Sequence, residues 1–177
     1  MTLKDQTVLL TGAARGIGQA TAVALAERGA HVIGVDLRAG DMAETARRVK
    51  TLGRRFVALE ADVADREAVR RVVDEAVAAG GFSVLVNNAG VLPSGPFAEI
   101  DFSVWARTIE VDLTGLMALT HAALPHLLAR PRAHIVNIAS IAGKFGASGL
   151  AAYCAAKHGV VGFSEALRFE LRRTRVG

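Results

Sequence analysis

The stretch VLLTGAARGIG, residues 8–18, decides the fold of this chain. Its apolar start predicts a short buried strand, and its glycines predict a tight turn into a helix. Glycine lets the backbone approach a phosphate, which can then bind the free N–H groups of the helix N-terminus. Gly12, Gly16 and Gly18 do not have the G-x-G-x-x-G spacing, so glycine content alone identifies no dinucleotide site. The strand before the turn and the helix after it favour a phosphate-binding role over a purely structural one.

Short apolar runs alternate with longer helical patterns along the rest of the chain. The predicted strands are residues 8–10, 31–35, 56–59, 82–86 and 134–138. The predicted helices are residues 16–29, 41–52, 65–79, 102–129 and 150–174. Nearly continuous apolar strands are typical of parallel strands that are buried on both faces. We therefore predict an α/β protein with a doubly wound parallel sheet (a Rossmann fold) in three α/β/α layers, as one domain over residues 1–177.

Composition argues against several classes of protein. Of the 177 residues, 51% are hydrophobic and 5% aromatic, which suits one core of aliphatic side chains. There is no apolar run of about 20 residues, and the polar N-terminus is not typical of a secretory signal. The single cysteine, Cys154, excludes an intramolecular disulfide and fits a reducing compartment. We therefore expect a cytoplasmic protein with no membrane partner.

Charge and histidine spacing exclude two further kinds of site. The net charge of +4 comes from basic residues that are scattered along predicted helices, mostly beside acids. Without stacking aromatics or zinc-ligand spacing, this pattern argues against a nucleic-acid partner. The five histidines show no shared metal-ligand spacing, so no metal site is expected.

Asp36 ends the second predicted strand. A carboxylate at this place can accept hydrogen bonds from both hydroxyls of an adenosine ribose, and it repels a 2′-phosphate. The alternative is a loop aspartate that caps the following helix. Arg15 and Arg38 oppose the first interpretation, because guanidinium groups could hold a phosphate. We expect the repulsion of a 2′-phosphate by Asp36 to outweigh its attraction to these arginines, which favours NAD(H) over NADP(H).

Tyr153 and Lys157 are four residues apart on a predicted helix and therefore share a face. A positive charge beside a phenol favours the phenolate, which makes the tyrosine a usable acid/base near neutral pH. Such pairs also arise by chance. Ser140, at the end of a predicted strand, could join them at one site, although a lone serine there is more commonly a turn residue.

Taken in order, these motifs resemble those of the short-chain dehydrogenase/reductase family over Thr2 to the last residue. The matching motifs are Thr11-Gly12-x-x-x-Gly16-x-Gly18, Asp62-Val63, Asn87-Asn88-Ala89-Gly90, Ser140 and Tyr153-x-x-x-Lys157. The resemblance implies an NAD(H)-dependent oxidoreductase that interconverts a secondary alcohol and a carbonyl. Ser140 would hydrogen-bond the substrate oxygen, Tyr153 would exchange its proton, and Lys157 would tune Tyr153 and bind the nicotinamide ribose.

The resemblance also implies how the cofactor is held. Asp62 would bind the adenine amino group and Val63 would pack on the adenine ring, whereas Asn87 would brace the sheet. The implied cofactor-binding residues are Gly12, Arg15, Gly16, Ile17, Gly18, Asp36, Leu37, Asp62, Val63, Asn88, Ala89, Gly90, Tyr153 and Lys157.

Asp112 is a departure from the family pattern, which usually has asparagine before Leu-Thr-Gly. In the family, the backbone carbonyl at this position holds a water that is linked to the lysine, and the replacement keeps that carbonyl. The resemblance therefore leaves open whether the usual proton relay is preserved. A carboxylate near Lys157 would favour the charged ammonium. Asp112 is therefore a fourth candidate catalytic residue, beside Ser140, Tyr153 and Lys157.

The C-terminus is the second departure. The chain ends at Gly177, where the resemblance expects a sixth strand and, after it, a substrate lid and a seventh strand. Without them, Ile135, Val136 and Ile138 would form an apolar sheet edge. We therefore expect a truncated chain.

Two functions remain open on the sequence. The leading one is the oxidoreductase, with a small and apolar alcohol or ketone as substrate. The alternative is a non-catalytic nucleotide-binding sensor or scaffold with the same fold. The resemblance further implies a homodimer or homotetramer that assembles through the two long late helices. Trp105 and Phe102 are expected to lie in the core or in helix contacts.

Overall fold

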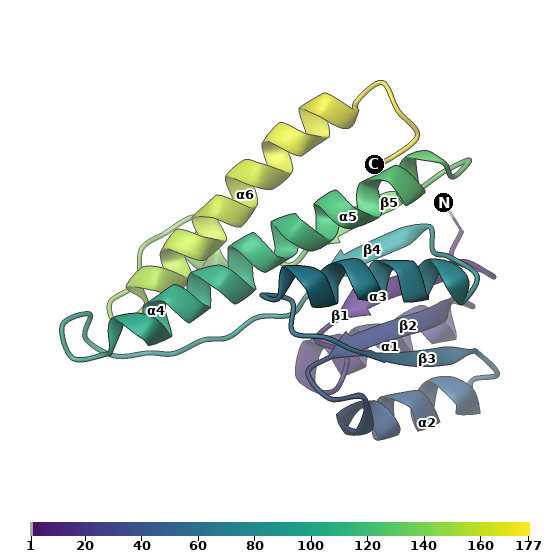
Figure 1. Ribbon diagram of the computed structural model, residues 1–177, viewed down its shortest axis with the longest axis horizontal. Helices are drawn as coiled ribbons and strands as arrows, with labels where there is room; N and C mark the ends of the chain where they lie inside the picture. The colour runs from purple at the N-terminus through teal and green to yellow at the C-terminus, as the bar shows by residue number, and fades with distance from the viewer. Residues whose placement is uncertain (1) are drawn as a thin grey trace.

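The structure, a computed structural model that describes residues 2–177, contains one five-stranded parallel sheet flanked by helices (Figure 1). The strand order is β3-β2-β1-β4-β5, and each neighbouring pair is parallel. The strands are β1 (Thr7–Thr11), β2 (His31–Asp36), β3 (Phe56–Glu60), β4 (Val84–Asn87) and β5 (His134–Asn137). The chain reverses direction across the sheet at β1, so the doubly wound prediction is confirmed.

Helices cover both faces of the sheet. They are α1 (Gly16–Glu27), α2 (Ala43–Thr51), α3 (Arg66–Ala78), α4 (Phe102–Ile109), α5 (Leu116–Leu128) and α6 (Ala151–Leu171). One core cluster joins α1 and α2 to the face that carries Val8 and Leu10, and the other joins α3 and α5 to the face that carries Leu9. Successive side chains of a strand point to opposite faces, so the apolar run of β1 contributes to both clusters. This arrangement is the predicted α/β/α architecture.

The predicted long helix over residues 102–129 is not a regular α-helix. A π-helical segment, Glu110–Gly115, connects α4 to α5 without a break. The segment lies close to the loop after β3, because a Cβ on Gly115 would come within 2.6 Å of the Val63 carbonyl oxygen. π-Helical turns inside α-helices often occur at functional sites. Here the segment carries Asp112, whose side chain is fully buried.

The last residues of the chain pair with the start of β5. Val176 forms a parallel bridge with Ala133, and the Ile135 N–H donates to the Gly177 carbonyl at 2.9 Å. Ile135 and Ile138 are half-buried, while Val136 is 44% exposed, so the expected apolar edge is largely confined to Val136.

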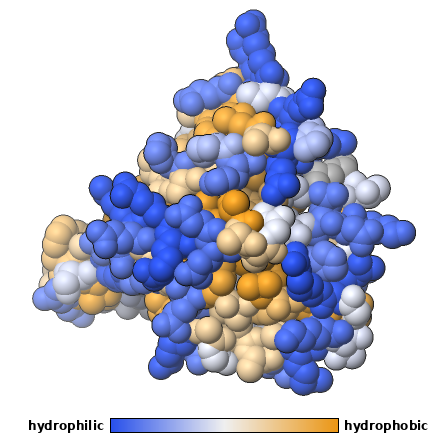
Figure 2. All heavy atoms as spheres, turned by 45° about the vertical axis from the view of Figure 1, so that its right-hand side comes forward, coloured by the Kyte–Doolittle hydropathy of each residue, from blue (hydrophilic) through white to orange (hydrophobic). Residues whose placement is uncertain are grey.

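Two sequence predictions need correction at the surface. The last helix ends at Leu171 rather than near residue 174, because Thr174 folds back and its hydroxyl donates to the Leu171 carbonyl at 2.8 Å. Trp105 is buried and stacks on Phe97 with ring centroids 5.8 Å apart, but Phe102 is 73% exposed at the first residue of α4. Figure 2 shows one face of the molecule, on which hydrophobic side chains lie among hydrophilic ones.

Candidate functional site: a glycine-turn cavity beside a tyrosine–lysine pair

The turn between β1 and α1 needs its glycines for steric reasons. Gly12 has φ +66° and Gly16 has φ +55°, a region that L side chains rarely adopt. A Cβ on Gly18 would overlap the Gly12 carbonyl oxygen. Asn88 braces the turn, since its Nδ2 donates to the Thr11 carbonyl at 2.9 Å. The turn is therefore packed closely against the end of β4.

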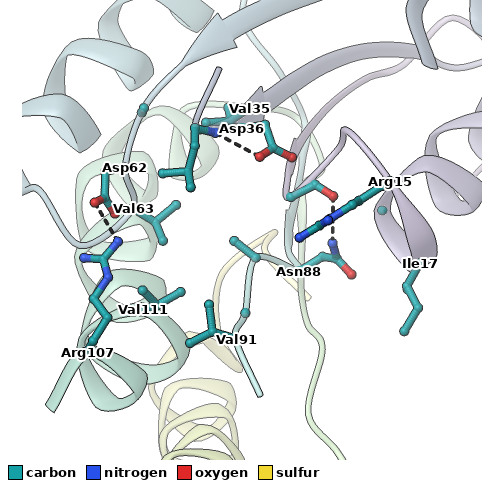
Figure 3. Close-up of a pocket in the computed structure, with 16 residues that line it drawn as sticks. Arg15, Ile17, Val35, Asp36, Asp62, Val63, Asn88, Val91, Arg107 and Val111 are labelled. Atoms are coloured by element: carbon teal, nitrogen blue, oxygen red, sulfur yellow. Dashed lines mark hydrogen bonds and ion pairs between the residues drawn. The ribbon is translucent and has the colours of Figure 1, made fainter. Parts of the chain in front are cut away.

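A cavity of about 340 Å³ opens over this turn at the carboxyl ends of β1, β2 and β4 (Figure 3). All the predicted cofactor-binding residues line it except Gly16, Tyr153 and Lys157. Ile17 and Leu37 are 67% and 59% exposed at its rim. Five further lining residues had no predicted cofactor role, and these are Val35, Ala61, Val91, Arg107 and Val111. Of these, the sequence placed only Val91 near the site, at the mouth where the substrate enters.

Asp36 is held at the cavity wall by two backbone groups. Its Oδ2 accepts from the Ala14 N–H at 2.8 Å and its Oδ1 from the Leu37 N–H at 2.9 Å. The carboxylate thus bonds the glycine turn and does not cap the helix that follows. Arg38, one of the two arginines that opposed the NAD(H) interpretation, pairs with Asp41 at 3.1 Å on the surface. Each oxygen of an ionised carboxylate has a second lone pair, so Asp36 can still accept from a ligand.

Asp62 lies at the opposite wall of the cavity. Its Oδ1 accepts from the Ala64 N–H at 2.9 Å, and its Oδ2 lies 2.6 Å from Arg107 Nη2. Arg107 comes from the last turn of α4, and Figure 3 shows the pair joined across the space between the two elements. The sequence pattern contained no sign of this pair, because the two residues are 45 positions apart.

Tyr153 and Lys157 lie together on α6, as their spacing predicts. Lys157 Nζ is 5.5 Å from the centroid of the Tyr153 ring. The Lys157 side chain is 6% exposed, and Nζ donates to the Ile138 carbonyl at 3.1 Å, just beyond β5. Tyr153 is half-buried. The pair therefore occupies the carboxyl end of the sheet, at the side of the cavity away from β3.

Ser140 begins a tight 3-10 turn, Ile141–Gly143, that packs on α6. Its hydroxyl oxygen accepts from the Ala142 N–H at 3.2 Å. Gly143 allows close packing, since a Cβ there would come within 2.6 Å of the Lys157 carbonyl oxygen. Ser140 is thus both a turn serine and a neighbour of the tyrosine–lysine helix.

Asp112 is a buried carboxylate that connects the lysine to the cavity. Its Oδ1 accepts from the Val91 N–H at 2.7 Å, and Val91 lines the cavity. Its Oδ2 lies 3.3 Å from Lys157 Nζ, an ion pair by distance, and has no aligned hydrogen-bond donor within the described chain. Burial raises the pKa of Asp112 above its ordinary value, although the Val91 N–H and the Lys157 charge both act to lower it.

The remaining candidates have structural roles or none. Asn87 braces the sheet, with its Nδ2 donating to Thr120 and to Asn137. Cys154 is buried, and its sulfur accepts from the Ala147 N–H at 3.4 Å. No group of three or more potential metal ligands occurs over residues 2–177. Across the same span, no helix has the length and apolar character to cross a membrane.

Comparison with known proteins places this geometry in a family. The family model described as short chain dehydrogenase matches residues 6–177. A cis-4-hydroxycyclohexanecarboxylate dehydrogenase of Sinomonas cyclohexanicum is 42% identical over 88% of this chain and 63% of its own length. A (-)-trans-carveol dehydrogenase of Rhodococcus erythropolis is 39% identical over 98% of this chain and 68% of its own length. The chain thus spans about two thirds of these relatives.

Solved structures agree with this relationship. The carveol dehydrogenase of Mycobacterium avium in complex with NAD is 35% identical, with a TM-score of 0.90 over 96% of this chain and 67% of that one. A short chain dehydrogenase/reductase of Burkholderia phymatum in complex with NAD is 31% identical, with a TM-score of 0.95 over 100% of this chain and 64% of that one. The strand order, the glycine turn and the family match lead to one conclusion: the chain belongs to the short-chain dehydrogenase/reductase family of oxidoreductases.

Proposed function

We propose that this chain is an NAD(H)-dependent oxidoreductase that interconverts a secondary alcohol and a carbonyl compound, with Tyr153 as the acid/base. The observation that carries the proposal is the packing of Tyr153 against the buried Lys157, beside the cavity of the glycine turn. The dehydrogenases of Sinomonas and Rhodococcus, named for a hydroxycyclohexanecarboxylate and for carveol, support an alcohol as the substrate class.

The cavity residues fit a dinucleotide. Gly12 and Gly18 let the turn pack tightly, because a Cβ on either would meet atoms of neighbouring residues. The tight turn leads directly into α1, whose N-terminal N–H groups can bind phosphates. Asp36 would accept from the ribose hydroxyls and would repel a 2′-phosphate, which favours NAD(H). When bound, the nicotinamide accepts or supplies the hydride.

The protein residues would hold and move the proton. The Tyr153 hydroxyl would donate to the carbonyl oxygen in reduction and accept from the alcohol in oxidation. Lys157 Nζ, 5.5 Å from the centroid of the Tyr153 ring, would stabilise the negative charge that develops on the phenol oxygen during proton transfer. Ser140, on the turn that packs on α6, would hold the substrate oxygen. Asp112 would keep the Lys157 side chain in place.

Tyr153→Phe tests this assignment. The variant keeps the aromatic ring but removes the transferable proton, so turnover should fall by about 10²–10⁴-fold. NADH affinity, followed by fluorescence titration, should stay within a few-fold of the unsubstituted protein. Turnover is followed by NADH absorbance with a panel of secondary alcohols and ketones, including cis-4-hydroxycyclohexanecarboxylate and carveol.

Two results would contradict the proposal in different ways. Residual activity within a few-fold of the unsubstituted protein would show that Tyr153 is not the acid/base. NADH binding by the unsubstituted protein without turnover of any compound in the panel would favour a non-catalytic nucleotide-binding protein.

A further inference from the structure

Arg107 is the charged residue of the cavity that the sequence motifs leave without a role. It lies on the last turn of α4, one turn before Val111, and its Nη2 is 2.6 Å from Asp62 Oδ2. Its Nη1 is 3.9 Å from Glu110 Oε2, a longer contact to the first residue of the adjoining π-helical segment. The side chain is 40% exposed, so it forms part of the cavity wall that a ligand can reach.

The Arg107–Asp62 pair presents complementary hydrogen-bonding groups to the cavity. Asp62 accepts from the Ala64 N–H with Oδ1 and from Arg107 with Oδ2. An ionised carboxylate has about four acceptor sites and a guanidinium has five N–H donors, so each partner keeps capacity for a ligand. An acceptor and a donor therefore lie side by side at one wall.

Apolar side chains flank this polar pair. Val63 follows Asp62, Val111 follows Arg107 by one helical turn, and both line the same part of the cavity (Figure 3). A flat heteroaromatic ring can pack its faces on valine side chains, while its polar edge meets the charged pair. The pair is thus placed to contact the edge of a base and not its face.

We propose that Arg107, paired with Asp62 at the cavity wall, is a specificity-determining residue that sets the tolerance of the base site for a 6-oxo purine. The inference rests on the proposed function, with the adenine of NAD(H) at Asp62 as the family resemblance implies. A 6-amino group donates to the Asp62 carboxylate. A 6-oxo group accepts from the Arg107 guanidinium, whereas without Arg107 it would face the carboxylate alone.

The alternative is a purely structural ion pair that holds α4 against the loop after β3. Partly exposed ion pairs contribute little to stability, and losing one weakens both dinucleotides equally. A change in the preference between two bases is therefore the measurement that separates a specificity role from a structural one.

The experiment compares NADH with its 6-oxo analogue, reduced nicotinamide hypoxanthine dinucleotide. Dissociation constants are measured for the unsubstituted protein and for Arg107→Met, Arg107→Lys and Arg71→Met. In the unsubstituted protein, the two constants should agree within about fivefold, because both bases find a partner. In Arg107→Met, the 6-oxo analogue should weaken by about tenfold to a hundredfold relative to NADH, as expected for a lost hydrogen bond to a charged group.

Two variants control the result. Arg107→Lys keeps a donor without the planar fork and should give an intermediate ratio. Arg71→Met removes an exposed arginine that pairs with Glu75 at 3.8 Å on α3, away from the cavity, and should change neither constant. Thermal unfolding checks that each variant is folded. If Arg107→Met does not fold, the test uses Arg107→Lys, through its ratio of dissociation constants for the 6-oxo analogue and NADH.

Each outcome bears on one proposal. A ratio in a folded Arg107 variant that stays within twofold of the unsubstituted protein overturns the role of Arg107, and so does equal weakening of both dinucleotides. Failure of the unsubstituted protein to bind either dinucleotide overturns the proposed function, and the base subsite falls with it.

Discussion

Replacing Asp112 with asparagine tests whether the cost of burying the Asp112 charge exceeds its attraction to Lys157. The substitution conserves shape, and the amide oxygen can still accept from the Val91 N–H, which Asp112 Oδ1 does now at 2.7 Å. It removes the negative charge that lies 3.3 Å from Lys157 Nζ. Asparagine does not titrate, so the pH dependence of the stability difference between the two proteins reports on the carboxyl group of Asp112.

Two large terms oppose each other at this position. Unit charges 3.3 Å apart attract by about 5 kcal/mol at an effective dielectric constant of about 20. Burying a carboxylate and an ammonium costs several kcal/mol for each ion, on the order of the attraction itself. The pKa of Asp112 is raised, with burial as the largest cause, so burial outweighs the attraction and the Val91 hydrogen bond together.

The raised pKa determines the sign of the pH effect. The protonated carboxyl group stabilises the fold fully below the unfolded-state pKa of about 3.9. That contribution is lost as pH rises through the higher pKa of the folded protein. The free energy of unfolding of the wild type, relative to Asp112→Asn, should therefore fall as pH increases from about 4 and then level off. Each pKa unit of displacement corresponds to about 1.4 kcal/mol.

Urea unfolding of both proteins at a series of pH values from 4 to 8 measures this difference. A wild type that gains stability over Asp112→Asn as pH rises would refute the reasoning, because it would mean that the attraction to Lys157 exceeds the cost of burial. Asp41→Asn is the matched control. Asp41 pairs with Arg38 at 3.1 Å on the surface, and its loss should change stability by less than about 0.5 kcal/mol at every pH.

The remaining predictions concern the cofactor end of the cavity. Asp36→Ala combined with Leu37→Arg should increase NADPH affinity relative to NADH affinity, because the double variant loses a carboxylate and gains a guanidinium at the cavity rim. If the unsubstituted protein already binds NADPH more tightly than NADH, our interpretation of Asp36 is wrong. Gly18→Ala should lower the free energy of unfolding by about 1–3 kcal/mol and abolish measurable NADH binding, because its Cβ would overlap the Gly12 carbonyl oxygen. Gly162→Ala, in open space on α6, should instead be stabilising by about 0.5–1 kcal/mol, and a similar loss in both variants would refute the steric argument.

Much of the fold was predictable because local patterns and the tertiary structure agree. The apolar runs of the strands are buried on two faces, and the turn after β1 needs glycine whatever packs above it. The π-helical segment Glu110–Gly115 was not predicted, because the sequence pattern indicated one continuous helix over residues 102–129. Its backbone responds to packing against α6 and the Val63 loop, which a local pattern cannot contain.

The candidate site divides in the same way. Tyr153 and Lys157 could be paired from the sequence, because four residues make one turn of a helix. Arg107 could not be assigned, since its partner Asp62 is 45 positions away and reaches it only after α4 has packed beside the loop that follows β3. Phe102 was expected in the core or in helix contacts but is exposed. Apolar spacing on a helix does not determine whether a neighbouring element covers the residue.

The sequence by itself therefore determined the parallel sheet, the glycine turn, the tyrosine–lysine pair and the carboxylate at Asp36. Each depends on residue type and short spacing, which act through the backbone over one turn or one strand. Only the tertiary structure decided that Asp112 is buried against Lys157 and that Arg107 joins Asp62 at the cavity wall. The energies of these ion pairs depend on distance and on burial, and both are set by how separate helices and strands pack together.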